Sequence, residues 1–214
     1  MAVIENLTGA ATLQVESDRS ALRAVIVPRG VGFGVSEVTG LVAAALAANA
    51  SVFAMRIDPG APVRLFLDHL RLQFTTITAF TTPITLGRRL ALFRGSGAAA
   101  SGGTAIAAAV RRHTAFGATS ECDAANGGDI RIATTGALTV AGITFEANPL
   151  AVMTLTHVGT AGAFADVAFE FGNQSCEVVL EPGQLLAVRN PIALDAAGTW
   201  QLSVNAQWRE AVAF

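Results

Sequence analysis

The chain has 214 residues, of which 52% are hydrophobic and 14% are charged, whereas an average soluble domain carries roughly 25% charged residues. This composition excludes a disordered chain, because disordered chains are poor in apolar residues and rich in charge. The net charge of −2 gives no global basic field, so we expect no nucleic-acid partner. The chain has no lysine, which excludes a phosphate-binding Walker motif.

The first 30 residues stand apart, because they contain a single short apolar run that ends at Pro28. We predict an extended N-terminal arm over residues 1–30 and a single folded domain over residues 31–214, since β-sandwiches of about 200 residues commonly form one domain. Extended segments bind partners by adding a strand to a sheet, which makes the arm the predicted partner interface. The candidate interface residues are Arg23, Ala24, Val25, Ile26, Val27 and Arg29.

Glycine-rich and alanine-rich segments follow the arm. Gly30, Gly32 and Gly34 predict an extended segment or a hinge, because no βαβ pattern accompanies them. The alanine-rich segments Gly40–Ala50 and Thr104–His113 are equally compatible with a short helix and with irregular structure, because alanine propensity is a weak predictor.

Period-two alternation of apolar and polar residues is the main strand signal. It is clearest in Thr199–Glu210 and recurs in Leu70–Phe74 and Ala165–Phe171, whereas Leu185–Val188 is predicted to be a short apolar strand between two turns. The alternation slips before Ile77, which predicts a β-bulge or a bend. Short alternating strands between frequent turns predict an all-β fold, an antiparallel jelly-roll-like β-sandwich with one or two short helices. In the last strand, the residues predicted to face the core are Trp200, Leu202, Val204, Ala206 and Trp208.

The stretch from Arg94 to Gly128 is poor in strand signals, so we expect a long excursion between two strands. Its first part, Gly95–Gly103, is expected to be a flexible surface loop. The basic pairs Arg88–Arg89 and Arg111–Arg112 either bind an acidic partner through bidentate hydrogen bonds or form solvated faces.

The polar residues form no convergent catalytic set, so we expect no enzymatic activity. His69, His113 and His157 are far apart, and Asp68 and His69 are neighbours in a strand, where they should point to opposite faces. The cluster from Glu121 to Asp129 either binds calcium or forms a solvated acidic turn, and its spacing does not match an EF-hand loop. We therefore expect no cofactor and no metal.

The cysteines and the apolar segments bear on the compartment. Cys122 and Cys176 are either two free thiols or one disulfide, and a small secreted scaffold would carry more cysteines. The N-terminus lacks the basic region and the continuous apolar stretch of a signal peptide. The longest apolar stretch, Leu41–Met55, is shorter than the roughly 20 residues of a membrane-spanning helix. We expect synthesis in the cytoplasm and no membrane partner.

Several segments of the chain resemble virion structural proteins of tailed bacteriophages. The resemblance is carried by LEPGQLLAVRN at 180–190 and GTWQLSVNAQWRE at 198–210, and more weakly by LFLDHLRLQF at 65–74, LFRG at 92–95 and DIRIA at 129–133. It covers roughly residues 35–210 and implies a jelly-roll-like sandwich on the outside of a phage head or within a tail. No catalytic residues come with it.

The leading hypothesis is a capsid decoration or cement protein in the virion, which binds the major capsid protein and associates with itself as a homotrimer. A tail, fibre or head–tail component is the first alternative. A carbohydrate-binding jelly-roll module is an alternative of another class, although Trp200 and Trp208 are expected to point inward and tyrosine is absent.

Overall fold

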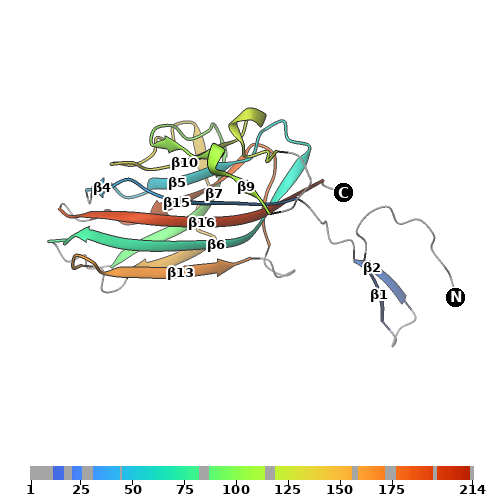
Figure 1. The fold of residues 1–214 in the computed structure, drawn as a ribbon, viewed down its shortest axis with the longest axis horizontal. Helices are drawn as coiled ribbons and strands as arrows, with labels where there is room; N and C mark the ends of the chain where they lie inside the picture. Colours follow the sequence, from blue (N-terminus) through green and yellow to red (C-terminus); the bar gives the residue numbers. More distant parts are fainter. Residues whose placement is uncertain are drawn as a thin grey trace.

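The computed structural model describes residues 12–16, 21–25, 31–43, 45–81, 87–113, 119–155, 159–171, 177–194 and 197–212. The predicted all-β fold is confirmed: two seven-stranded antiparallel sheets pack face to face as a sandwich (Figure 1). Sheet I has the order β13 (Phe164–Glu170), β6 (Val63–Thr78), β16 (Thr199–Val212), β3 (Val31–Val38) and β9 (Arg111–Arg112), with β14 (Val178–Leu180) on β6 and β4 (Val42–Ala43) on β16. Sheet II has the order β11 (Ile143–Phe145), β7 (Arg88–Gly97), β15 (Gln184–Asn190), β5 (Ala50–Arg56), β10 (Asp129–Ile132) and β8 (Thr104–Ala105), with β12 (Ala151–Leu155) on β7.

The strand pairing identifies the sandwich as a jelly roll. Its eight principal strands, in chain order, are β3, β5, β6, β7, β12, β13, β15 and β16. The first pairs with the eighth, the second with the seventh, the third with the sixth, and the fourth with the fifth. This is the pairing of one long antiparallel hairpin rolled into two sheets, which is the architecture shared by viral capsid and lectin domains.

The core lies between the two sheets and is organised by β16. Its five predicted inward residues are at most 1% exposed, which confirms the alternation. Trp200 stacks on Phe74 with ring centroids 4.7 Å apart, and Trp208 stacks on Phe33 at 6.0 Å. Each pair joins β16 to a neighbouring strand, so aromatic contacts reinforce the backbone ladder at both ends of the strand.

Two β-bulges shape β6. Thr78 pairs with Thr199 and Thr76 with Trp200, so Ile77 is the extra residue, and the predicted bulge is confirmed. A second register shift leaves Asp68 as the extra residue between Leu67 and His69. The prediction that Asp68 and His69 point to opposite faces is therefore wrong, because a bulge interrupts the period-two alternation and leaves both side chains outside the core.

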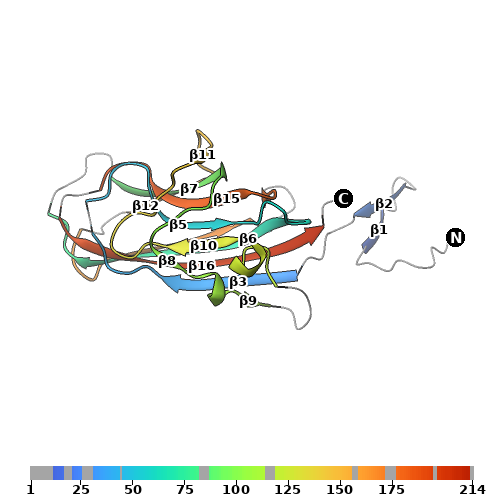
Figure 2. The ribbon, with the colours of Figure 1, turned by 90° about the horizontal axis from the view of Figure 1, so that it is seen from above.

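The predicted excursion, Arg94–Gly128, begins too early, since Arg94–Gly97 belong to β7, and the described residues between β7 and β12 lie against the sandwich. These residues add β9 to the edge of β3 and β10 to the edge of β5 (Figure 2). Leu138, also between β7 and β12, packs with Ala54, Leu185 and Ala187 in a second apolar cluster. The central strands β5 and β15 of sheet II are therefore covered on both faces, whereas the outer face of sheet I carries exposed and half-buried side chains.

The helix and loop predictions have mixed outcomes. In Gly40–Ala50 the described residues form β4 and a turn rather than a helix, because Val42 is buried where β4 pairs with Trp200. Thr104–His113 contains one 3-10 turn, η1 (Ala107–Ala109), between β8 and β9. A second turn, η2 (Ala124–Asn126), was not predicted. The predicted loop Gly95–Gly103 begins too early, since Gly95–Gly97 pairs with β11.

The N-terminal arm contains a hairpin. β1 (Thr12–Glu16) and β2 (Ala21–Val25) form a separate two-stranded antiparallel sheet. Arg23, Ala24 and Val25 lie in β2 and pair with β1, which was not predicted. The other three candidate interface residues, Ile26, Val27 and Arg29, lie outside the described residues.

Candidate partner interface

Four large apolar side chains are exposed at one end of sheet I. They are Val38, Leu41, Ile77 and Phe164, with 50%, 46%, 42% and 66% of their surface exposed. Val38 ends β3, Leu41 precedes β4, Ile77 lies near the end of β6, and Phe164 begins β13, so antiparallel pairing brings them to the same end. We call these four residues the apolar end. Among the described residues, the fifth large exposed apolar side chain, Val152, lies on sheet II.

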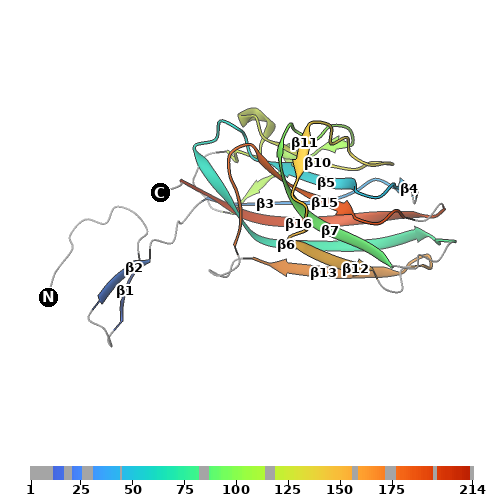
Figure 3. The same cartoon turned by 180° about the vertical axis from the view of Figure 1, so that it is seen from behind.

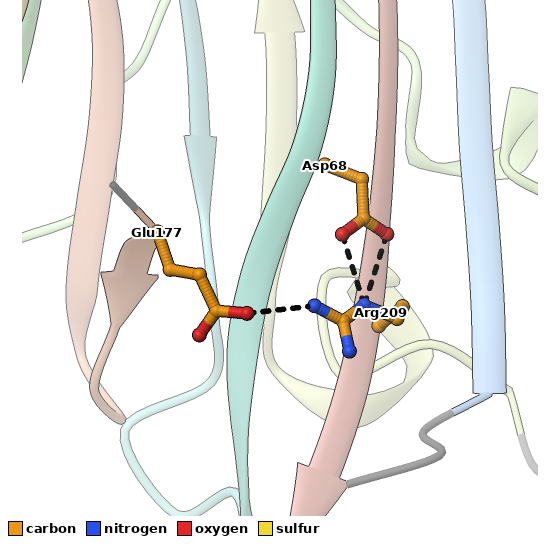
Figure 4. A network of polar contacts seen from close by, with 3 residues as sticks. All are labelled: Asp68, Glu177 and Arg209. Atoms are coloured by element: carbon orange, nitrogen blue, oxygen red, sulfur yellow. Dashed lines mark hydrogen bonds and ion pairs between the residues drawn. The ribbon is translucent and has the colours of Figure 1, made fainter. Parts of the chain in front are cut away.

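The other half of the outer face of sheet I is charged and carries several ion pairs. Arg209 donates from Nε to both carboxylate oxygens of Asp68, at 2.9 and 3.1 Å, and from a terminal nitrogen to Glu177 at 3.1 Å (Figure 4). Burial lowers the pKa of Arg209, and the hydrogen bonds and charges of Asp68 and Glu177 raise it, with a net rise. The bulge at Asp68 makes this arrangement possible, because it turns that carboxylate to the outer face.

Two further pairs join β6 to β13. Arg71 binds Asp166 through Nε at 3.0 and 3.2 Å, and the hydrogen bond and charge of Arg71 lower the pKa of Asp166. His69 Nδ1 lies 2.7 Å from the carboxylate of Glu170. Exposed pairs of this kind contribute little to stability, but they give the face a fixed pattern of charge. A shallow hollow of about 200 Å³ lies beside them, lined by Ser36, Arg71, Gln73, Ser203, Val204 and Asn205.

A buried carboxylate anchors the returning excursion to the end of β16. Glu210 is 7% exposed and accepts hydrogen bonds from the Ser120 hydroxyl at 2.6 Å and the Trp208 indole at 2.9 Å, both on one oxygen. Its other oxygen accepts the backbone N–H of Glu121 at 2.9 Å. Sequence reasoning missed this cluster, although Glu210 has the same strand parity as Trp208 and should therefore face inward.

The thiol of Cys122, which lies beside this cluster, is a poor candidate for a nucleophile. Cys122 is free and fully buried, and burial, followed by the charge of Glu210, raises its pKa well above the usual value. A protonated, inaccessible thiol is a poor nucleophile. Of the two open cysteine alternatives, the structure bears out a free thiol at Cys122, and Cys176 lies outside the described residues.

In the acidic turn, the side chains of Asp123, Asn126 and Asp129 hydrogen-bond within the protein. Asp123 accepts the N–H of Ala125 and caps η2, whereas Asp129 binds Arg131 at 2.7 Å. Asn126 donates to the carbonyl of Ser120 at 3.1 Å. Among the described residues, no group of three or more His, Cys, Asp or Glu side chains is placed to hold a metal ion.

Of the three histidines, the structure describes His69, on β6, and His113, which follows β9. His113 packs over the glycines of β3: a Cβ atom on Gly34 would lie 2.6 Å from His113 Nε2. The glycine-rich segment is therefore extended strand that leaves room for this ring, and not a hinge. His157 lies outside the described residues.

Comparisons with known proteins give no family. No protein-family model and no curated protein sequence matches the chain. One similar solved structure is the VP2 subviral particle of infectious bursal disease virus, with 15% identity over 95% of this chain and 47% of that chain, and a TM-score of 0.19. The Gx strain of the same virus matches with 12% identity over 96% of this chain and 46% of that chain, and a TM-score of 0.13. The chain thus spans about half the length of these proteins, and the jelly-roll assignment rests on strand pairing rather than on these alignments.

The described residues contain no helix long and apolar enough to cross a membrane.

Proposed function

We propose that this chain is a non-enzymatic structural protein of a tailed-bacteriophage particle, a decoration or cement protein that binds the shell of major capsid protein on its outer surface. Its synthesis in the host cytoplasm is part of the proposal. The observation that carries the proposal is the apolar end, which exposes four large side chains at one end of a jelly-roll sheet and is suited to contacts between the subunits of an assembly. Large apolar side chains left exposed on a folded domain are typical of surfaces that bind other proteins.

The mechanism is passive and follows from repetition. Burial of apolar surface contributes about 25 cal/mol per Å², from which the costs of association are subtracted. A modest contact repeated over every subunit of a shell therefore adds a large total resistance to internal pressure. No covalent chemistry is needed, and the charged half of sheet I, whose pairs are already satisfied, acts as a polar rim.

We assign the contact with the capsid to the N-terminal arm, which contains Arg23, Ala24 and Val25 in β2 and continues through Ile26, Val27 and Arg29. Within the described residues, β2 pairs along one edge with β1 only, so its other edge is available for strand addition. The test is co-sedimentation of purified chain with particles that lack it. Removal of residues 1–30 should abolish co-sedimentation while the circular dichroism spectrum and melting temperature of the domain persist; undiminished binding would refute the role of the arm.

A tail, fibre or head–tail position within the same virion is the nearest alternative. Localisation of the chain in an electron-microscopy reconstruction of the particle separates these positions, because decoration requires density on the outer surface of the head.

One observation in the structure favours the alternative of a carbohydrate-binding function. Phe164 is an exposed aromatic ring on β13, and its neighbour on the same face, Asp166, binds Arg71 at the edge of the polar hollow. Sugars stack on exposed aromatic rings and hydrogen-bond to such planar polar groups. A glycan array probed with the wild-type chain and with Phe164→Ala tests this alternative, which requires binding that the substitution removes.

A further inference from the structure

We infer that a second copy of this chain covers the apolar end, with the β13 edge of one copy packed against the β3–β9 edge of the next, so that the copies close a ring. This inference names the partner of a surface on which the proposed function rests. It concerns the isolated chain, however, and its test needs no virus particle.

The two edges are opposite sides of the same sheet. The order β13-β6-β16-β3-β9 separates them by four strand spacings, or about 19 Å at 4.8 Å per spacing. Within the described residues, β13 pairs with β6 alone, so its outer backbone edge has no neighbouring strand (Figure 3). Such an edge is a ready surface for another chain unless it is protected.

Opposite charges lie at the same height on the two edges. The cross-strand register runs from Glu170 to His69, Gln207, Gly34 and finally Arg111. This single row therefore carries a carboxylate at the β13 edge and a guanidinium at the β9 edge.

Both charged groups are placed to accept another partner. The Glu170 side chain is 69% exposed and contacts His69 with one oxygen. The Arg111 guanidinium is exposed and donates to the backbone carbonyls of Ala108 and Val110, at 3.1 and 3.3 Å, and no carboxylate of the described residues binds it.

The apolar residues match in the same way. Phe164 lies in the row of Thr75 and Gln201 at the β13 edge. At the opposite edge, Leu41 lies between Thr39, whose N–H binds the carbonyl of Leu202, and Val42, which pairs with Trp200. Leu41 is therefore at about the height of Gln201, and Val38 is in the adjacent row through Ser203. Each edge presents an apolar group at one end of the sheet and a charge further along it.

This matching selects one kind of symmetry. A rotation axis parallel to the strands keeps every residue at its height, so Phe164 of one copy meets Leu41 and Val38 of the next while Glu170 meets Arg111. A two-fold contact between two β13 edges would instead place the carboxylates Asp166 and Glu170 of both copies along one seam, without the guanidinium of Arg111. Head-to-tail contacts of this kind generate closed rings when the rotation closes.

The test is charge reversal measured by sedimentation velocity and light scattering over a concentration series of the full chain. Wild-type chain should form one closed oligomer. Glu170→Arg and Arg111→Glu should each raise the dissociation constant about tenfold or more, because each places like charges across the contact. The double variant should restore association, since it exchanges the two charges across the same contact.

The controls separate misfolding and the two proposals. Phe164→Asp should give a monomer, whereas Val152→Asp, which changes another exposed apolar residue, on the other sheet, should leave the oligomer intact. The ring would be overturned if the wild-type chain stayed monomeric at 100-fold the concentration used in the particle assay. It would also be overturned if the double variant associated no more tightly than either single variant. A ring that forms but fails to bind particles would refute the proposed function and leave the ring standing.

Discussion

Removal of the buried carboxylate at the end of β16 should be among the most damaging single changes in this chain. Glu210→Ala deletes one group that accepts three hydrogen bonds, from Ser120, Trp208 and the backbone of Glu121. Ser120 and Trp208 are each 1% exposed, so water cannot replace the lost acceptor without entering the core.

The magnitude follows from the donors left behind. A buried donor without an acceptor costs about 1–3 kcal/mol, and two of the three donors are buried. Part of this cost is offset, because the variant no longer desolvates a charge. We expect a loss of about 3 kcal/mol of unfolding free energy, which for a chain of this size lowers the melting temperature by about 6–12 °C.

Glu210→Gln is the matched comparison. Its retained carbonyl oxygen can still accept from Ser120 and Trp208, while its amide nitrogen faces the N–H of Glu121, so we expect about 1–2 kcal/mol of loss. The assay is urea unfolding followed by the fluorescence of Trp200 and Trp208, the two tryptophans of the chain. A Glu210→Ala variant within 0.5 kcal/mol of wild type, or less damaging than Glu210→Gln, would refute the assignment of this cluster as an anchor.

Three further predictions concern the domain. Gly34→Ala should lower the melting temperature, because the added Cβ would lie 2.6 Å from His113 Nε2, and Gly34→Ala combined with His113→Ala should recover part of the loss. Burial, followed by the charges of Glu210 and Asp58, raises the pKa of Glu121, so the folded state binds its proton more tightly than the unfolded state does and stability falls as the pH rises through that pKa. Glu121→Gln should therefore raise the melting temperature at pH 7, and this gain should disappear in acid; a gain that persists below the pKa of an unfolded glutamate would contradict this explanation. Cys122, buried and with a raised pKa, should not react with a thiol reagent in the native protein and should react at once in urea.

The parts of the fold that depend on local alternation were predictable from the sequence. The inward face of Thr199–Glu210 follows the period-two pattern and the bulge at Ile77 interrupts it, so both can be recognised within a single strand. The bulge at Asp68 could not be predicted, because the residues from Leu67 to Leu70 can be assigned to the two faces of a strand in more than one way. The pairing of β6 with Gln207 and Trp208 on β16 determines which assignment is correct.

The apolar end could not be predicted for a different reason. Val38, Leu41, Ile77 and Phe164 are ordinary apolar residues of strands or strand ends in the sequence. Their exposure depends on which strands lie at the sheet edge and on which loops cover them, and both are long-range properties. Gly40–Ala50 shows the same limit, because pairing with β16 outweighs the helix propensity of its alanines.

The position of Glu210 was partly predictable from the sequence. Its strand parity, the same as that of Trp208, indicates that the carboxylate faces inward, but two of its donors come from Ser120 and Glu121, 90 and 89 residues away. An inward-facing charge at the end of a core strand is therefore a usable signal for a distant anchor even when its partners are unknown.

The central claim is that this jelly roll is a repeated structural subunit on the outside of a phage head. Quantitative mass spectrometry of particles purified from a culture that produces the chain tests it most directly. We expect the chain to copurify with the particle at a fixed ratio to the major capsid protein, with a copy number set by the symmetry of the shell. Absence of the chain from the purified particles would contradict this structural role.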